Sequence, residues 1–170
     1  MAPPVCAAPC FRPLRKRPAP PAMNTGRIPL MRSLTLDHTT RATVAAALDG
    51  DAWTVACLCA AWCGTCSSYR DTFEALAQRH PDKHFVWIDI EDQADLVGDL
   101  DVENFPTLLL QRGDTVAFFG TTVPDGAVAD RLVQAQAEQT PDELARLAQS
   151  SDERRAWQRE CNLRVLLGEN

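Results

Sequence analysis

The sequence has no continuous run of about 18 apolar residues, the length that a helix needs to cross a membrane. It also lacks the apolar core of a secretory signal, because the segment Val5–Phe11 is short and is interrupted by Pro9. His38, His80 and His84 form no pairing pattern, and the single Cys-x-x-Cys has no second copy. We therefore expect neither a membrane partner nor a four-ligand zinc site.

Acidic residues are absent from the first 32 positions, which hold six basic residues and eight of the twelve prolines. A segment of this composition cannot bury a core, so we expect residues 1–32 to form a disordered Pro/Arg-rich tail. Subtracting its six positive charges from the formal net charge of −6 leaves −12 on the rest of the chain. This acidic remainder argues against nucleic acid as the main partner.

The seven cysteines are odd in number and scattered along the chain. Cys6 and Cys10 lie in the predicted tail, Cys57 and Cys59 lie in an apolar segment, and Cys161 lies near the end. Such scatter is typical of a reducing compartment, where unpaired thiols do no harm. We therefore expect a cytoplasmic protein without a framework of structural disulfides.

The Cys-x-x-Cys lies where a strand is predicted to end and a helix to begin. The preceding segment, 53–60, is short, apolar and β-prone. Apolar residues then recur at three- and four-residue steps, which is typical of an amphipathic helix, at Cys66, Tyr69, Phe73, Leu76 and Ala77. At a helix start the Cys63 thiol faces unpaired backbone N–H groups that favour a thiolate, and Cys66 lies one turn away. This arrangement predicts a redox site.

The motif Trp62-Cys63-Gly64-Thr65-Cys66 resembles the active site of the thioredoxin family. The segment 104–110, with Phe105 and Pro106, resembles the cis-proline strand of that family, and Gly120 matches its glycine near the last strand. The resemblance covers roughly residues 33–136. It implies an α/β thioredoxin fold, in which a mixed central β-sheet is flanked by helices.

The pattern of the chain agrees with this fold class. Helices are expected after the first, second, third and fifth strands, and the strands are predicted at 33–36, 53–60, 84–90, 107–111 and 115–119. The order β-α-β-α-β-α-β-β-α predicts helices on both faces of the sheet. We divide the chain into a tail at 1–32, a thioredoxin-like domain at 33–138 and a C-terminal extension at 139–170.

The extension is predicted to form a helical hairpin. Thr140 and Glu143 make a capping box with Pro141 at the first helical position, and Ser150 with Glu153 repeats the box. One interpretation is that the hairpin packs on its own domain. The other is that it offers a docking surface for a partner.

The resemblance implies roles for the site residues. Cys63 is the nucleophile that attacks a substrate disulfide, and Cys66 resolves the mixed disulfide. Among the supporting residues, the Trp62 ring is expected beside the nucleophile, Gly64 is expected to allow close backbone approach, and the Thr65 hydroxyl can hydrogen-bond a thiolate. Pro106 is expected after a cis peptide, where Phe105 would narrow the groove or add an apolar contact.

The sequence departs from the family behind the site. Thioredoxins carry a buried aspartate six residues before the first cysteine and a lysine in the next strand, but here Cys57 and Trp87 occupy these positions. Water can carry the proton of the resolving thiol more slowly, Asp89 or Glu91 can supply a base, or Cys57 or Cys59 can join the exchange. We favour the first outcome and expect both cysteines to act mainly as core residues.

The resemblance implies a protein-disulfide reductase that works without a bound cofactor. Its expected partners are protein disulfide substrates and an external electron donor, either a flavin-dependent reductase or glutathione, and we expect a monomer. One alternative is a thioredoxin-fold adaptor or redox sensor that binds a partner through its C-terminal helices. Another is an oxidase or isomerase of an oxidising compartment.

Overall fold

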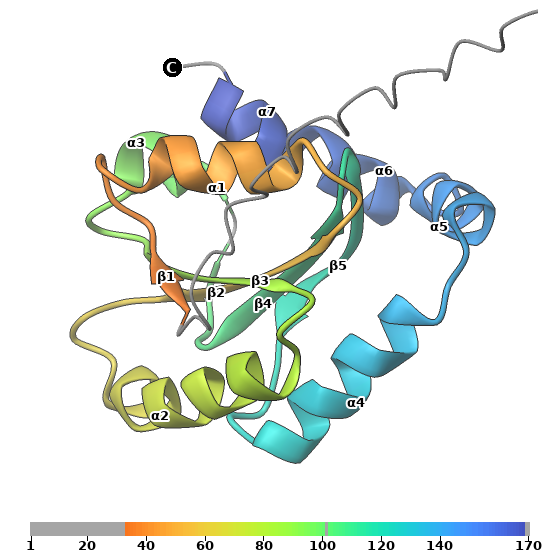
Figure 1. Cartoon of the computed structure of the whole chain (residues 1–170). Helices are drawn as coiled ribbons and strands as arrows, with labels where there is room; N and C mark the ends of the chain where they lie inside the picture. The colour runs from red at the N-terminus through yellow and green to blue at the C-terminus, as the bar shows by residue number, and fades with distance from the viewer. Residues whose placement is uncertain (1–32, 101, 169–170) are drawn as a thin grey trace, which may run out of the picture.

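The computed structural model describes residues 33–100 and 102–168. A five-stranded sheet lies at its centre, in the order β1-β3-β2-β4-β5 (Figure 1). The strands are β1 (Leu34–Thr35), β2 (Trp53–Cys59), β3 (His84–Asp89), β4 (Thr107–Arg112) and β5 (Thr115–Thr121). The first three are parallel, whereas β4 runs antiparallel to β2 and β5 antiparallel to β4. The predicted mixed sheet is confirmed, and the predicted tail at 1–32 lies outside the described residues.

Helices cover both faces of this sheet, as expected. On one face lie α2 (Gly64–Arg79) and α4 (Gly126–Ala137) (Figure 1). On the other lie α1 (Arg41–Leu48), α3 (Ala94–Val97) and α7 (Leu163–Gly168). Two further helices, α5 (Pro141–Ala148) and α6 (Asp152–Glu160), lie beyond β5 at the edge of the sheet. No helix of the described part of the chain is long and apolar enough to span a membrane.

Strand β2 brings the Cys-x-x-Cys to the end of the sheet. It is hydrogen-bonded on both sides, by β3 and by β4, and all seven of its residues are buried. Side chains alternate between faces along a strand, so Val55, Cys57 and Cys59 pack in the cluster that contains α2. Ala56 and Leu58 pack in the cluster that contains α1. The site is therefore attached to a fully buried strand in the middle of the sheet.

Helix α2 carries the predicted apolar face, since Cys66, Tyr69, Phe73, Leu76 and Ala77 are all buried. Its C-terminal end is held by His80, to which the sequence assigned no role. The His80 Nε2 atom lies 2.6 Å from Asp130 Oδ1 on α4, and the imidazole stacks on Phe85. These contacts join both helices on this face to β3.

One helix boundary in the C-terminal extension differs from the sequence prediction. The second capping box is wrong, because Ser151 rather than Ser150 caps α6 by accepting the Arg154 N–H. Ser150 instead donates its hydroxyl to a carbonyl at the end of α5.

The C-terminal extension contains three short helices rather than a two-helix hairpin. The backbone turns at Cys161, and Asn162 starts α7 by accepting the Arg164 N–H through its side-chain oxygen at 3.0 Å. An asparagine in this position is a strong N-cap, so its hydrogen bond ends one helix and begins the next.

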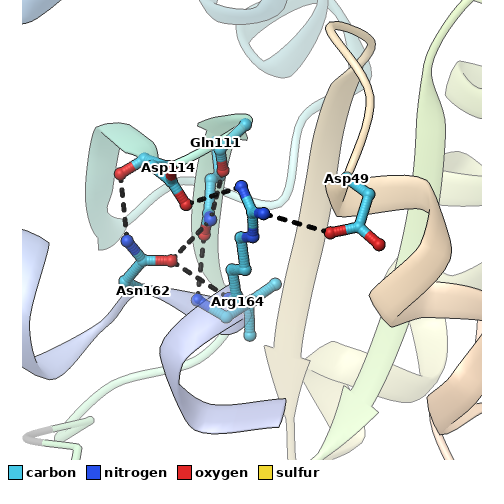
Figure 2. Close-up of polar contacts among 7 residues, drawn as sticks. Asp49, Gln111, Asp114, Asn162 and Arg164 are labelled. Atoms are coloured by element: carbon cyan, nitrogen blue, oxygen red, sulfur yellow. Dashed lines mark hydrogen bonds and ion pairs between the residues drawn. The ribbon is translucent and has the colours of Figure 1, made fainter. Parts of the chain in front are cut away.

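The extension packs on its own domain, which confirms the first of the two interpretations. Figure 2 shows Asn162 against Gln111 of β4, with the Gln111 amide nitrogen 2.7 Å from Asn162 Oδ1. Gln111 Oε1 accepts the Leu163 N–H at 2.9 Å, and Asn162 also donates to the Asp114 carbonyl at 3.0 Å. Cys161 and Leu163 are buried among the residues of α1 and the sheet. The extension therefore completes the core.

Candidate active site

Cys63 is the N-cap residue of α2. Its backbone is extended, at φ −80° and ψ 108°, and its half-buried Sγ accepts the Cys66 backbone N–H at 3.4 Å. This hydrogen bond is the main reason that the pKa of the Cys63 thiol lies below its usual value of 9.0, and the Thr65 N–H and hydroxyl add to it. Each of these donors stabilises the thiolate and not the thiol. The start of α2 therefore favours the thiolate form of Cys63.

We predict that iodoacetamide alkylates Cys63 with a pH midpoint below 9.0 and leaves Cys66 nearly unreactive. The reaction rate follows the thiolate fraction, so it rises with pH and levels off above the lowered pKa. Thr65→Val is expected to move the midpoint upward, because the variant loses the hydroxyl donor. Peptide mass mapping across a pH series gives the midpoint, and a value of 9.0 or higher would contradict this view of Cys63.

Cys66 has the opposite environment. Its side chain is 2% exposed, and burial is the largest cause that raises the pKa of its thiol above 9.0. A hydrogen-bonding contact with the Cys59 thiol raises this pKa further. The two cysteines of the motif are thus unequal, with an outer thiol that ionises readily and an inner thiol that stays protonated at neutral pH.

Behind Cys66 the structure places the residues that replace the charged pair of the family. Cys57 is aligned with Trp87 in the neighbouring strand, and its Sγ lies 3.7 Å from that of Cys59. The pKa of the Cys59 thiol is raised, first by its hydrogen bond with Cys57 and then by burial. A thiol with a raised pKa, as at Cys59, and an indole, as at Trp87, supply no strong base for the Cys66 proton.

The two carboxylates considered as substitute bases are engaged elsewhere. Asp89 accepts the Glu91 N–H at 2.9 Å, and Glu91 accepts the Trp62 indole N–H at 3.1 Å. Another polar group on α2 is the hydroxyl of Tyr69, which is buried and has no hydrogen-bond partner in the described part of the chain. Burial raises its pKa, and the Cys57 and Cys59 thiols add to this effect. The sequence pattern identified Tyr69 only as a core residue of α2.

An aromatic surface flanks the nucleophile. The Trp62 side chain is 69% exposed, and its ring lies edge-on to Phe105 with centroids 5.7 Å apart. The Phe105–Pro106 peptide is cis, as predicted, and Pro106 is buried beside it. A β-carbon on Gly64 would meet no atom within 4 Å. Trp62 thus forms an exposed aromatic surface with the partly buried Phe105, and the space beside Gly64 is open.

The described residues hold no group of three or more His, Cys, Asp or Glu side chains arranged to bind a metal ion. Around Cys63 lie the Cys66 thiol, backbone N–H donors and the Trp62–Phe105 pair.

The comparisons with known proteins agree with this geometry. The family model for thioredoxin matches residues 36–134. The chain is 33% identical over 79 residues to "Putative thioredoxin 2" of Streptomyces coelicolor, covering 45% of this chain and 58% of that protein. The chain thus spans little more than half the length of this curated relative.

Solved structures share the fold. Thioredoxin f from spinach chloroplast gives a TM-score of 0.54 at 23% identity, covering 63% of this chain and 95% of that one. A structure of ferredoxin:thioredoxin reductase with thioredoxin f2 gives a TM-score of 0.55 at 21% identity, covering 63% and 96%. These values establish the thioredoxin fold.

Proposed function

The chain belongs to the thioredoxin family, and from this premise we propose that it is a thiol–disulfide oxidoreductase that reduces protein disulfides through Cys63 and Cys66. The observation that carries the proposal is the position of the Cys63 thiol. It combines a helix N-cap, a lowered pKa and an open aromatic surface beside Trp62 and Phe105. These features support an attack by Cys63 on a substrate that rests against the aromatic side chains.

The proposed reaction has two exchange steps. The Cys63 thiolate attacks one sulfur of the substrate disulfide, which forms a mixed disulfide and releases the first substrate thiolate. Cys66 then loses its proton and attacks the Cys63 sulfur, which forms the Cys63–Cys66 disulfide and releases the second thiolate. The substrate gains two electrons and the protein loses two.

The test is the reduction of insulin disulfides with dithiothreitol as electron donor. We expect the protein to accelerate the precipitation of the insulin B chain in proportion to its concentration, compared with dithiothreitol alone. A rate that does not change with added protein would overturn the proposal.

We propose an external donor for the return of electrons, because the pair is its own redox centre. The donor is either a flavin-dependent reductase or glutathione. One of the related structures holds a thioredoxin with ferredoxin:thioredoxin reductase, which supports a reductase partner for this chain. We also propose a cytoplasmic location, since seven cysteines, odd in number and scattered along the chain, suit a reducing compartment.

The second exchange step is expected to depend strongly on pH. Because burial raises the pKa of Cys66, its thiolate fraction grows about tenfold per pH unit between about pH 6 and pH 9. Stopped-flow release of thionitrobenzoate from its mixed disulfide with Cys63 measures this step, and we expect a rise without a plateau.

Cys57→Asp is expected to raise the rate at neutral pH and to flatten this profile, because a carboxylate behind Cys66 can accept the proton. Cys57→Ser, which adds no base, is the matched control. A plateau near neutral pH in the unmodified protein would show that a base already acts on Cys66.

A further inference from the structure

The indole of Trp62 is hydrogen-bonded to a carboxylate that follows β3. Trp62 Nε1 donates to Glu91 Oε1 at 3.1 Å. Trp62 follows β2, and because β2 and β3 are parallel neighbours, their carboxyl ends lie at the same edge of the sheet. The Ile90 N–H also donates to the Cys59 carbonyl at 2.9 Å, which continues the pairing beyond the end of β3. Glu91 therefore contacts the residue that directly precedes Cys63.

The backbone of Glu91 is held by a turn, whereas its side chain has unused bonding capacity. Asp89 Oδ1 accepts the Glu91 N–H at 2.9 Å and the Asp92 N–H at 3.5 Å, which fixes the turn after β3. The Glu91 side chain is exposed, and its second oxygen, Oε2, makes no hydrogen bond or ion pair with any described residue. One oxygen of this carboxylate is thus available to a further partner.

The exposed ring of Trp62 is a second feature that attracts cations. Its side chain is 69% exposed, and its aromatic contact is with Phe105 at a centroid distance of 5.7 Å. A lysine ammonium or an arginine guanidinium binds over an indole face, because the face carries the negative part of the ring's charge distribution. The hydrogen bond from the indole N–H to the Glu91 carboxylate polarises the ring in the sense that strengthens this attraction.

We propose that Glu91 and Trp62 together bind a lysine or arginine side chain of the substrate, beside the disulfide that Cys63 attacks. The protein then prefers protein disulfides that are flanked by a basic residue. This inference rests on the function proposed above, since it names the substrate class of the same site. Glu91 is the specificity-determining residue, and the two cysteines keep the roles assigned to them.

The charges around Glu91 agree with a cationic partner. In the part of the chain that the structure describes, Asp89, Glu91 and Asp92 form no ion pair with a lysine or arginine, and the nearest ion pair along the chain joins Asp95 to Arg41 at 2.8 Å. No described basic side chain therefore competes with the substrate for Glu91. An acidic residue at the same position of the substrate would be repelled.

The test compares three cyclic peptides, each closed by one disulfide and identical except for the residue beside it, which is Lys, Gln or Glu. Dithiothreitol is the electron donor, chromatography separates reduced from oxidised peptide, and the rate with dithiothreitol alone is subtracted for each peptide. We expect kcat/KM to be about 5- to 10-fold higher for the Lys peptide than for the Glu peptide, mainly through KM. In about 1 M NaCl this ratio is expected to fall below about twofold.

Two variants with the same change of charge identify the responsible carboxylate. Glu91→Gln keeps an oxygen that can accept the Trp62 N–H but has no negative charge, so we expect the ratio to fall below about twofold. Asp92→Asn removes a charge one position away that makes no hydrogen bond with Trp62, and it is expected to keep more than half of the preference. Equal losses in the two variants would assign the preference to the general negative charge and overturn the inference.

The unmodified protein separates this inference from the proposed function. Equal kcat/KM values for the three peptides, all reduced faster than by dithiothreitol alone, would overturn the inference and leave the function intact. No acceleration with any peptide or with insulin would overturn the proposed function, and the inference with it.

Discussion

Replacing Cys63 by serine is expected to lower the rate of insulin reduction by about 10³-fold or more, to the level of dithiothreitol alone. Serine keeps the size and the N-cap hydrogen bond of the side chain, but its hydroxyl does not ionise near neutral pH. The loss should therefore appear without a change in stability, which thermal unfolding followed by circular dichroism can check.

Cys66→Ser is the variant matched to Cys63→Ser. It is expected to block the second exchange step and not the first. Cys63 can still attack a substrate, but the mixed disulfide is no longer resolved. We expect covalent complexes with protein substrates on non-reducing gels, which dithiothreitol removes. Substantial insulin reduction by Cys63→Ser, or a lack of trapped complexes with Cys66→Ser, would contradict the assigned roles.

Replacing Gln111 by alanine is expected to lower the free energy of unfolding by about 2–4 kcal/mol. The Gln111 side chain is fully buried, donates to Gly113 at 2.8 Å and to Asn162 at 2.7 Å, and accepts the Leu163 N–H (Figure 2). Its removal leaves the Leu163 N–H without a partner in a buried position and opens a cavity beneath α7. Urea unfolding measures the change.

Arg164→Ala is the control for this prediction, because it removes contacts from the same region at the surface. Arg164 pairs with Asp114 at 2.9 Å and with Asp49 at 3.2 Å, but it is 43% exposed (Figure 2). Exposed ion pairs contribute little, so we expect a loss of less than about 1 kcal/mol. Equal losses for the two variants would show that the extension is not anchored through Gln111.

The sequence predicted the parts of the fold that depend on local pattern. The apolar repeat after Cys66, the short apolar segment before Cys63 and the strand segments 107–111 and 115–119 all specify elements over a few residues. Gly113 adopts a positive φ of 53° at the turn of the hairpin, as its position between two strands suggests. The motif and the segment around Pro106 then placed these elements in a known fold.

The features that sequence reasoning missed depend on pairs of distant residues. Gln111 follows an apolar strand segment, and nothing near it indicates a partner 51 positions away. The contact of His80 with Asp130 joins residues 50 positions apart. The role of Asn162 as a helix N-cap could have been predicted from the sequence, because an asparagine before Leu163 and Arg164 is typical of a helix start.

For the inner part of the site, the sequence predicted only which residues replace the charged groups of the family. Cys57 and Trp87 were identified as the residues that stand where the family has charged groups, and their alignment across β2 and β3 agrees with this. The effect of the Cys59 thiol on the pKa of Cys66 was not predicted, because it depends on how the end of a strand meets the first turn of a helix. Side-chain periodicity gives the face of each residue but not how closely two elements approach.

The most direct test of the central claim is an equilibrium redox titration of the purified protein in glutathione or dithiothreitol buffers, with thiol mapping at each potential. We predict a Cys63–Cys66 disulfide with a reduction potential near or below about −250 mV, which is the range of reducing thioredoxins. A potential above roughly −200 mV would indicate an oxidase or isomerase. If Cys63 and Cys66 never pair, this would contradict the account altogether.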